Sequence, residues 1–430
     1  MMTDAYISIA ILIIAFILFL TEVFPLAITA LLVPISLVLT GVLSAKQAFA
    51  DFANKWTLIF MFMFMVGEAL FRTGFAQKAG EWAVKAAKGS EVRLMLNIMI
   101  ITAFLSAFLS NTGTTVCLLP IVLAIVRVGG YSPRSFLMAL AYAASFGGTL
   151  SLIGTPPNGV VNALLDKAGL QPFGFFEFGK VGIIITIIGI AYMVLLGRKF
   201  LPKGQLTGEA EEAASERASF KPRLEKMPLA VAIFFFVVAI MVLSGTPATK
   251  HFFRKVLHLD LLVAAALGAF LVVATRCITW KEAWQAVDWT TVFLFACMFP
   301  LSTALKITGG VKLIAHAVTS IVHTPFGLLA AMAFVTAFLT QFASNTATTM
   351  IVAPIALAAA QGMGVNPYPV IMAVAISASC CFMTPIATPP NTIVLGPGQL
   401  RFIDYIKAGW LIQLISYIVC IVFVPMLWKF

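Results

Sequence analysis

The chain has 430 residues, of which 61% are hydrophobic and only 10% are charged, and its mean hydropathy is +1.02. Soluble globular proteins are about 45–50% apolar and about 25% charged. This composition therefore excludes a soluble enzyme, a nucleic-acid-binding protein, a secreted disulfide scaffold and a disordered chain. It predicts an all-α polytopic membrane protein.

Ten apolar runs are long enough to cross a bilayer, which takes about 20 residues in a helix. They cover residues 4–22, 25–43, 56–73, 134–166, 176–199, 227–244, 259–275, 289–306, 367–395 and 402–428. Two further apolar stretches, 93–127 and 325–360, are interrupted halfway by Ser, Asn and Thr. Each is too long for one crossing, and we expect each to turn back as a re-entrant hairpin surrounded by protein or a water-filled cavity.

The positive charges predict how the chain lies in the membrane. In this topology about two thirds of the 28 lysine and arginine residues fall on one side, which the positive-inside rule assigns to the cytoplasm. We therefore expect a multi-pass protein of the cell (plasma or inner) membrane, in contact with membrane lipids. Both termini lie outside the cytoplasm, and residues 201–226 form a cytoplasmic linker. The net charge of +11 is then a topology signal rather than a sign of nucleic-acid binding.

An internal duplication is the strongest feature of the sequence. Ser-Asn-Thr-Gly-Thr-Thr at 110–115 matches Ser-Asn-Thr-Ala-Thr-Thr at 344–349, and Gly-Thr-Pro-Pro-Asn at 154–158 matches Ala-Thr-Pro-Pro-Asn at 387–391. The two halves, residues 1–200 and 227–430, each contain five predicted crossings, one hairpin and one helix broken by Pro-Pro (134–166 and 367–395). Because five is odd, the second repeat is inverted relative to the first. Inverted repeats that meet near the midplane are a transporter architecture.

The Ser-Asn-Thr motifs suit a site for an anion and a cation together. At a hairpin tip, one half-helix ends with unpaired carbonyl groups and the next begins with unpaired N–H groups. Ser, Asn and Thr cap helix N-termini, so their presence at the break is expected. A tip at Ser110-Asn111-Thr112 can bind a cation through oxygen atoms and an anion through N–H and hydroxyl groups.

The Thr-Pro-Pro-Asn motifs predict two more helix N-termini at membrane depth. Proline lacks an N–H group, so Pro156 and Pro157 interrupt the helical hydrogen bonds, and Thr155 or Thr388 is expected to cap the restarted helix. Two hairpin tips and two broken helices would then bring four helix N-termini to one polar centre. That centre suits a small dianion without a buried arginine.

Each motif alone has a simpler explanation. A single Ser-Asn-Thr in a membrane helix is typical of hydrogen bonding between helices, and a single Pro-Pro is typical of a kink. The duplication in register favours the binding interpretation.

Glu68 lies one turn before Arg72, which indicates an ion pair rather than a proton relay. Coupling to Na⁺ through neutral oxygens is therefore favoured over proton coupling.

The paired motifs on inverted repeats resemble those of the divalent anion/sodium symporter family, over essentially the whole chain. The resemblance implies a homodimer in which a transport domain slides against a scaffold domain as an elevator. It implies a first sodium site formed by Ser106, Ser110, Asn111 and Gly154, and a second formed by Thr340, Ala343, Asn345 and Ala387. The residues implied for the substrate carboxylates are Asn111, Thr112, Thr155, Asn345, Thr346, Thr388 and Pro389.

These observations predict a secondary transporter that imports a small divalent anion, a C4 dicarboxylate such as succinate, by Na⁺ symport without an organic cofactor. The alternatives are a Na⁺-independent dicarboxylate exchanger of the same fold and a citrate or sulfate transporter. An anion channel on this scaffold is a different class, which bilayer currents would distinguish. An enzyme is not expected, because the sequence has no nucleophile–base or metal constellation.

Overall fold

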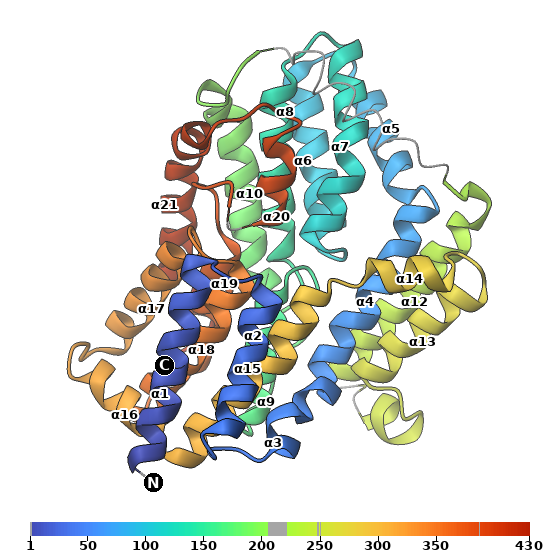
Figure 1. Cartoon of the computed structure of the whole chain (residues 1–430). Coiled ribbons are helices and arrows are strands. Elements are labelled where there is room, and N and C mark those ends of the chain that lie inside the picture. Colours follow the sequence, from blue (N-terminus) through green and yellow to red (C-terminus); the bar gives the residue numbers. More distant parts are fainter. Residues whose placement is uncertain (1, 205–221, 247–248, 250, 387) are drawn as a thin grey trace.

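The computed structural model describes residues 2–204, 222–246, 249, 251–386 and 388–430, and these residues form helices joined by loops (Figure 1). The helices of the first half are α1 (Met2–Thr21), α2 (Leu26–Leu39), α3 (Ala45–Phe49), η1 (Ala50–Ala53), α4 (Lys55–Arg72), α5 (Phe75–Ala87), α6 (Glu91–Ser106), α7 (Asn111–Val128), α8 (Pro133–Gly148), α9 (Pro156–Lys167), α10 (Gly179–Leu195) and η2 (Gly197–Lys199). Those of the second half are η3 (Leu224–Lys226), α12 (Met227–Gly245), η4 (Phe252–Val256), α13 (Leu261–Ala274), α14 (Trp280–Ala286), α15 (Trp289–Thr308), α16 (Gly310–Thr319), α17 (Pro325–Leu339), α18 (Asn345–Gly362), α19 (Tyr368–Ser379), α20 (Pro389–Leu395) and α21 (Phe402–Leu427).

Five helical segments in the described part of the chain are long and apolar enough to cross a membrane. They are Thr3–Thr21, Ala45–Arg72, Leu224–Gly245, Trp289–Thr308 and Phe402–Leu427. Other predicted crossings coincide with shorter apolar helices, among them α2, α10 and α13. Aliphatic and aromatic side chains on their outer faces are exposed, as expected of helices that meet lipid rather than water.

The four polar motifs all lie where one helix ends and the next begins. The breaks separate α6 from α7, α8 from α9, α17 from α18 and α19 from α20. Ser110 and Ser344 each accept a hydrogen bond from the backbone N–H three residues later, at 3.1 and 3.2 Å. The restarted helices α7 and α18 are therefore capped by the serine of each motif.

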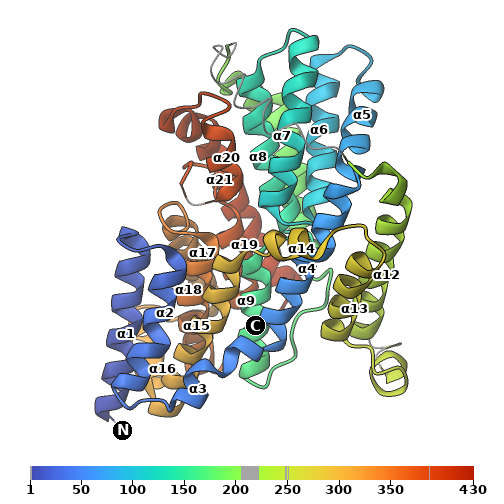
Figure 2. The ribbon, with the colours of Figure 1, turned by 45° about the vertical axis from the view of Figure 1, so that its right-hand side comes forward.

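The two halves are interlocked through their short second half-helices. Helix α9 of the first half packs against α18 and α19 of the second, while α20 of the second half packs against α7 and α8 of the first. Figures 1 and 2 show α20 beside α8 and α9 beside α18 from two directions. This exchange brings all four motifs to the same region of the molecule.

A left-handed glycine separates α4 from α5, and another separates α15 from α16. Gly74 has φ 84° and Gly309 has φ 83°, a region that favours glycine. A Cβ atom on Gly74 would lie 2.7 Å from Leu224 Cδ2, whereas one on Gly309 would meet nothing within 4 Å. The end of the linker thus covers only the first of these two turns.

A chain of alternating charges fastens the same linker end to α4 and α14. The Arg223 guanidinium donates to both carboxylate oxygens of Glu282, at 2.8 and 3.0 Å. Arg72 contacts Glu282 at 3.6 Å and Glu68 at 2.6 Å. The hydrogen bonds from Arg223 hold the pKa of Glu282 well below its usual range, at about 2.

The C-terminal end of α9 is also held by ion pairs. Lys167 Nζ lies 2.6 Å from Asp51 Oδ2 and donates to the Phe299 carbonyl at 3.2 Å. Asp166 pairs with Lys55 at 2.7 Å. Through these contacts one end of α9 is fixed to η1, α4 and α15, while its other end carries the Thr-Pro-Pro motif.

Candidate functional site

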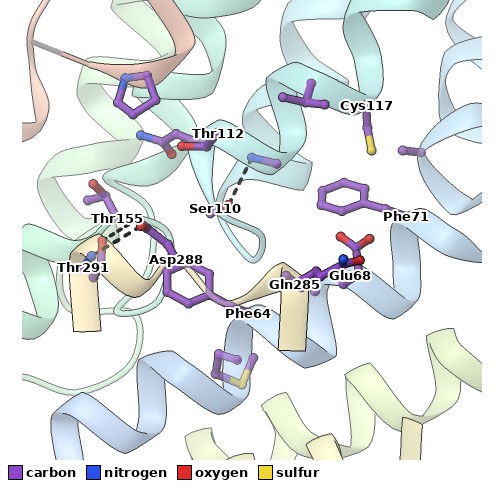
Figure 3. Close-up of a pocket in the computed structure, with 18 of the residues that line it drawn as sticks. Phe64, Glu68, Phe71, Ser110, Thr112, Cys117, Thr155, Gln285, Asp288 and Thr291 are labelled. Carbon is purple, nitrogen blue, oxygen red and sulfur yellow. Dashed lines mark hydrogen bonds between the residues drawn. The ribbon is translucent and has the colours of Figure 1, made fainter. Parts of the chain in front are cut away.

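A cavity of about 1110 Å³ lies where the four motifs meet. Its wall contains all seven residues predicted for the substrate, together with Ser110 and Ser344. Figure 3 shows Ser110, Thr112 and Thr155 around one end, opposite Glu68 and Phe71 of α4. The fold therefore brings together side chains that are more than 200 residues apart in the sequence.

The hairpin tips present backbone donors to this cavity. The helical hydrogen bonds begin with Thr114 N to Ser110 O at 3.0 Å and Thr348 N to Ser344 O at 2.9 Å. The first two residues of each helix, Asn111-Thr112 and Asn345-Thr346, precede these donors, so their N–H groups are not used in the helical hydrogen bonds. Such groups at a helix N-terminus, with the positive end of the helix dipole, favour an anion.

Helices α9 and α20 contribute to the cavity in a different way. Both begin with two prolines, which have no N–H group to donate. The prediction that Thr155 and Thr388 cap these helices is wrong, because neither side chain makes a capping hydrogen bond. Both hydroxyl-bearing side chains instead belong to the cavity wall.

Three of the four residues implied for the first sodium site, Ser106, Asn111 and Gly154, form a cluster rich in oxygen atoms, while the Ser110 side chain caps α7. Ser106 Oγ lies 2.7 Å from Asn111 Oδ1 and 2.7 Å from the Ala144 carbonyl. One hydroxyl hydrogen cannot serve both acceptors. As oriented, the Asn111 amide oxygen faces only acceptors; with oxygen and nitrogen exchanged, the nitrogen would donate to Ser106, Ala144 and Gly154 at 2.7, 3.0 and 3.1 Å. In either orientation the oxygen atoms of Ser106, Ala144 and Gly154 lie around the Asn111 amide, and oxygen atoms are the ligands of small hard cations.

The second half repeats this cluster. Thr340 Oγ1 lies 2.8 Å from Asn345 Oδ1 and 2.9 Å from the Ala378 carbonyl. Thr340 and Ala343 are buried. Ala387, the remaining residue implied for the second sodium site, lies outside the described residues. Asn111 and Asn345 thus occupy matching positions, each at its oxygen cluster and each in the cavity wall.

Charged side chains are absent from the four motifs, and those in the described cavity wall lie elsewhere. They are Glu68, Arg72, Glu81 and Asp288. Arg72 is paired with Glu68, as predicted. Asp288 accepts hydrogen bonds from Thr290 N and Thr291 N and so caps α15. The end of the cavity formed by the motifs therefore offers an anion dipoles and neutral donors rather than a side-chain cation.

Sequence reasoning missed the outer part of the cavity. Its wall continues along α7 through Val116 and Cys117 to Ile125 and reaches Pro222 at the end of the linker. These apolar residues carry no signal that separates them from ordinary core positions. Asp288 could have been found, because Asp directly before Trp289-Thr290 is a helix N-cap signature, and the same Trp-Thr pair occurs in the first half at 56–57.

The fold and the cavity together define a polytopic helical membrane transporter. Two solved transporters share the fold. The YdaH transporter of Alcanivorax borkumensis has a TM-score of 0.61 and 14% identity, covering 90% of this chain and 87% of its own. MtrF of Neisseria gonorrhoeae has a TM-score of 0.59 and 15% identity, covering 92% and 84%.

The chain belongs to the citrate transporter family, whose model matches residues 16–368 and 259–430. It is 32% identical over 431 residues to an uncharacterized transporter of Haemophilus influenzae (96% of this chain, 89% of that protein). It is 27% identical over 443 residues to the sodium-dependent high-affinity dicarboxylate transporter 3 of Caenorhabditis elegans (92% and 78%). It is 26% identical over 435 residues to the sodium-dependent dicarboxylate transporter SdcS of Staphylococcus saprophyticus (94% and 82%). The resemblance predicted from the motifs is confirmed, and the protein is a transporter rather than an enzyme.

Proposed function

We propose that this transporter imports a small divalent anion, a C4 dicarboxylate such as succinate, by Na⁺ symport. The observation that supports the proposal is that Asn111 and Asn345 each belong both to the cavity wall and to an oxygen cluster. Each side chain lies in the cavity wall and, at the same time, within 2.8 Å of a hydroxyl oxygen of an oxygen-rich cluster. A single amide can then contact a cation with its oxygen and a carboxylate with its nitrogen.

The electrostatics of the cavity favour coupling to a cation. A dianion in this cavity would meet no unpaired side-chain cation among the described wall residues, since Arg72 is bound to Glu68 and Glu282. Helix dipoles and neutral donors offset only part of the cost of moving two negative charges out of water. Two Na⁺ ions bound at the matching clusters would supply the remaining positive charge. The two relatives named as sodium-dependent dicarboxylate transporters support this choice of ions.

We further propose an elevator mechanism in a homodimer, with two inverted repeats, residues 1–200 and 227–430. The matching hydrogen bonds at the two tips support the duplication. With the linker on the cytoplasmic side and the termini outside, a cavity that extends to Pro222 corresponds to an inward-open state. The elements that carry the motifs, from α6 to α9 and from α17 to α20, would move together.

The test is uptake of radiolabelled succinate into proteoliposomes with an imposed Na⁺ gradient, compared with K⁺ or choline at the same ionic strength. Uptake that requires Na⁺ supports symport, and competition by malate, citrate and sulfate then ranks the anions. Uptake that occurs only when the proteoliposomes are preloaded with dicarboxylate would contradict symport and indicate an exchanger. Absence of succinate uptake in both conditions would contradict the dicarboxylate assignment.

A further inference from the structure

The last residue of each Thr-Pro-Pro-Asn motif has no place in the proposed binding site. Asn158 and Asn391 are fully buried and are absent from the cavity wall. Burying an amide without hydrogen bonds costs several kcal/mol by rough transfer estimates. Their presence at the same position of both halves therefore requires an explanation from their contacts.

Both side chains bind the loop that precedes their own helix, in the same pattern. Asn158 Nδ2 donates to the carbonyls of Ser151 at 2.7 Å and Gly148 at 3.2 Å. Asn391 Nδ2 donates to the equivalent carbonyls, Thr384 at 2.8 Å and Cys381 at 3.2 Å. Neither Oδ1 has a hydrogen-bond partner among the described residues. Each amide therefore acts here only as a donor.

In the first half, one of the two residues whose carbonyls bind the amide, Gly148, lies next to the oxygen cluster. A Cβ atom on Gly148 would lie 2.5 Å from Asn111 Oδ1, and one on Gly154 would lie 2.6 Å from the Gly148 carbonyl oxygen. The backbone of Gly148 is thus packed directly between Asn111 and Gly154. Asn158 donates to this same carbonyl oxygen of Gly148.

A second attachment joins each loop to its hairpin. Ser151 Oγ donates to the Ala107 carbonyl, and its counterpart Thr384 Oγ1 donates to the Gln341 carbonyl at 2.6 Å. Ala107 and Gln341 directly follow Ser106 and Thr340, the hydroxyl residues of the two clusters. In each half the asparagine therefore binds both ends of a four-residue segment, 148–151 or 381–384, and the second of these ends is also bound to the hairpin.

We propose that Asn158 and Asn391 are positioning residues for the two sodium sites, an inference that rests on the proposed function. By holding two carbonyl groups three residues apart at the helix break, each amide sets the distance between the break and the hairpin asparagine. Neither side chain touches Na⁺ or the substrate. Partners that orient metal ligands typically change metal affinity about 10–100-fold when they are removed.

The experiment measures Na⁺ binding without transport. The melting temperature of the purified protein is recorded against NaCl concentration, with choline chloride keeping the ionic strength constant and without substrate. The variants are Asn158→Leu and Asn391→Leu, which remove the donors at nearly constant volume. The matched control is Asn162→Leu, one turn further along α9, where the buried amide pairs with Phe173 N and O, both at 2.9 Å, away from the clusters.

We expect the half-saturating Na⁺ concentration to rise about tenfold or more in Asn158→Leu and Asn391→Leu, and to stay within about twofold of wild type in the control. At saturating Na⁺ the half-saturating succinate concentration for uptake should return close to the wild-type value. Should Asn158→Leu fail to fold, Asn391→Leu and Asn158→Ser, whose hydroxyl keeps one donor, are read by the same criterion.

Two results separate the possible failures. If wild-type protein melts at the same temperature in Na⁺ and choline, the sodium sites themselves are refuted, and the positioning role with them. If wild type responds to Na⁺ but the two asparagine variants respond as the Asn162→Leu control does, the sodium sites stand and the positioning role is overturned.

Discussion

An asparagine side chain carries an acceptor and two donors on opposite edges of one plane, and Asn111 and Asn345 are placed where both edges have a use. We expect Asn111→Ala and Asn345→Ala each to lower succinate uptake at least about tenfold, because each change removes a charge-assisted hydrogen bond, for which roughly 1.5–3 kcal/mol is typical. Uptake into proteoliposomes checks this. Size-exclusion chromatography should show that both variants remain folded.

Asn97 provides the matched control for these two changes. It lies on hairpin helix α6, where its Nδ2 donates to the Ala83 carbonyl at 3.1 Å, and it does not line the cavity. Asn97→Ala should transport at close to the wild-type rate. Wild-type uptake by Asn111→Ala or Asn345→Ala would remove these asparagines from the site.

Among single residues, the sequence was most informative about polar residues and proline pairs within apolar segments, because a membrane helix has little structural use for them. Two Ser-Asn-Thr and two Pro-Pro motifs indicated the polar wall of the cavity. The apolar wall along α7 could not be predicted, because Val116 and Ile121 have the same chemistry as core residues. The roles assigned to the motif residues in binding anion and Na⁺ stay predictions.

At the scale of single elements, helix α9 is anchored by two ion pairs, of which one is more deeply buried than the other. The side chains of Asp51 and Lys167 are 10% and 23% exposed, whereas those of Asp166 and Lys55 are 38% and 44% exposed. Lys167→Met should lower the melting temperature by several degrees, because it leaves a desolvated carboxylate unpaired. Lys55→Met should change it by less than about 1 °C.

Thermal unfolding of the single variants and of the double variant Asp51→Asn/Lys167→Met tests this contrast. The double variant should recover part of the loss, since it removes both charges together. Equal effects of Lys167→Met and Lys55→Met would show that burial does not distinguish the two pairs.

The contact between the linker end and α14 predicts a pH dependence. The pKa of Glu282 is lowered to about 2 by Arg223, so this carboxylate stabilises the fold fully above about pH 4.5, its unperturbed value. That contribution is lost progressively as the pH falls from 4.5 towards 2. Glu282→Gln should therefore melt roughly 1–3 °C below wild type at pH 7, and the difference should shrink as the pH is lowered to 3.5. A difference that is constant with pH would contradict the pairing.

Some features of the elements followed from local chemistry and others did not. Proline pairs and serine caps indicated where helices begin, and α9 and α20 do begin at Pro156 and Pro389. The prediction that Thr155 and Thr388 cap α9 and α20 was wrong. Both residues lie in the cavity wall and make no capping hydrogen bond. That α9 packs within the second half and α20 within the first is a property of the tertiary fold, which no local pattern encodes.

At the scale of the whole molecule, the helical membrane class and the transporter family were predicted correctly, because composition and the duplicated motifs are global signals. The orientation in the membrane stays a prediction, and two exposed lysines can test it. We expect Lys203→Cys, at the start of the linker, to react with a membrane-impermeant maleimide only after the cells are opened.

Lys46→Cys, in the short helix α3, should react in intact cells. Both single-cysteine variants are made in a background without the six native cysteines. The reverse pattern of labelling would invert the topology and place the termini in the cytoplasm.

The four motifs contain no ionisable side chain, and this has a consequence for the response to membrane voltage. Moving one elementary charge through the membrane field changes the free energy by about 2.3 kcal/mol per 100 mV. Motifs that move without a bound ion or anion carry no charge of their own, so they would add no charge movement to the return of the empty binding elements. In the loaded step the membrane potential would act on the net charge of the bound ions, which is zero for two Na⁺ with one dianion and +1 for three.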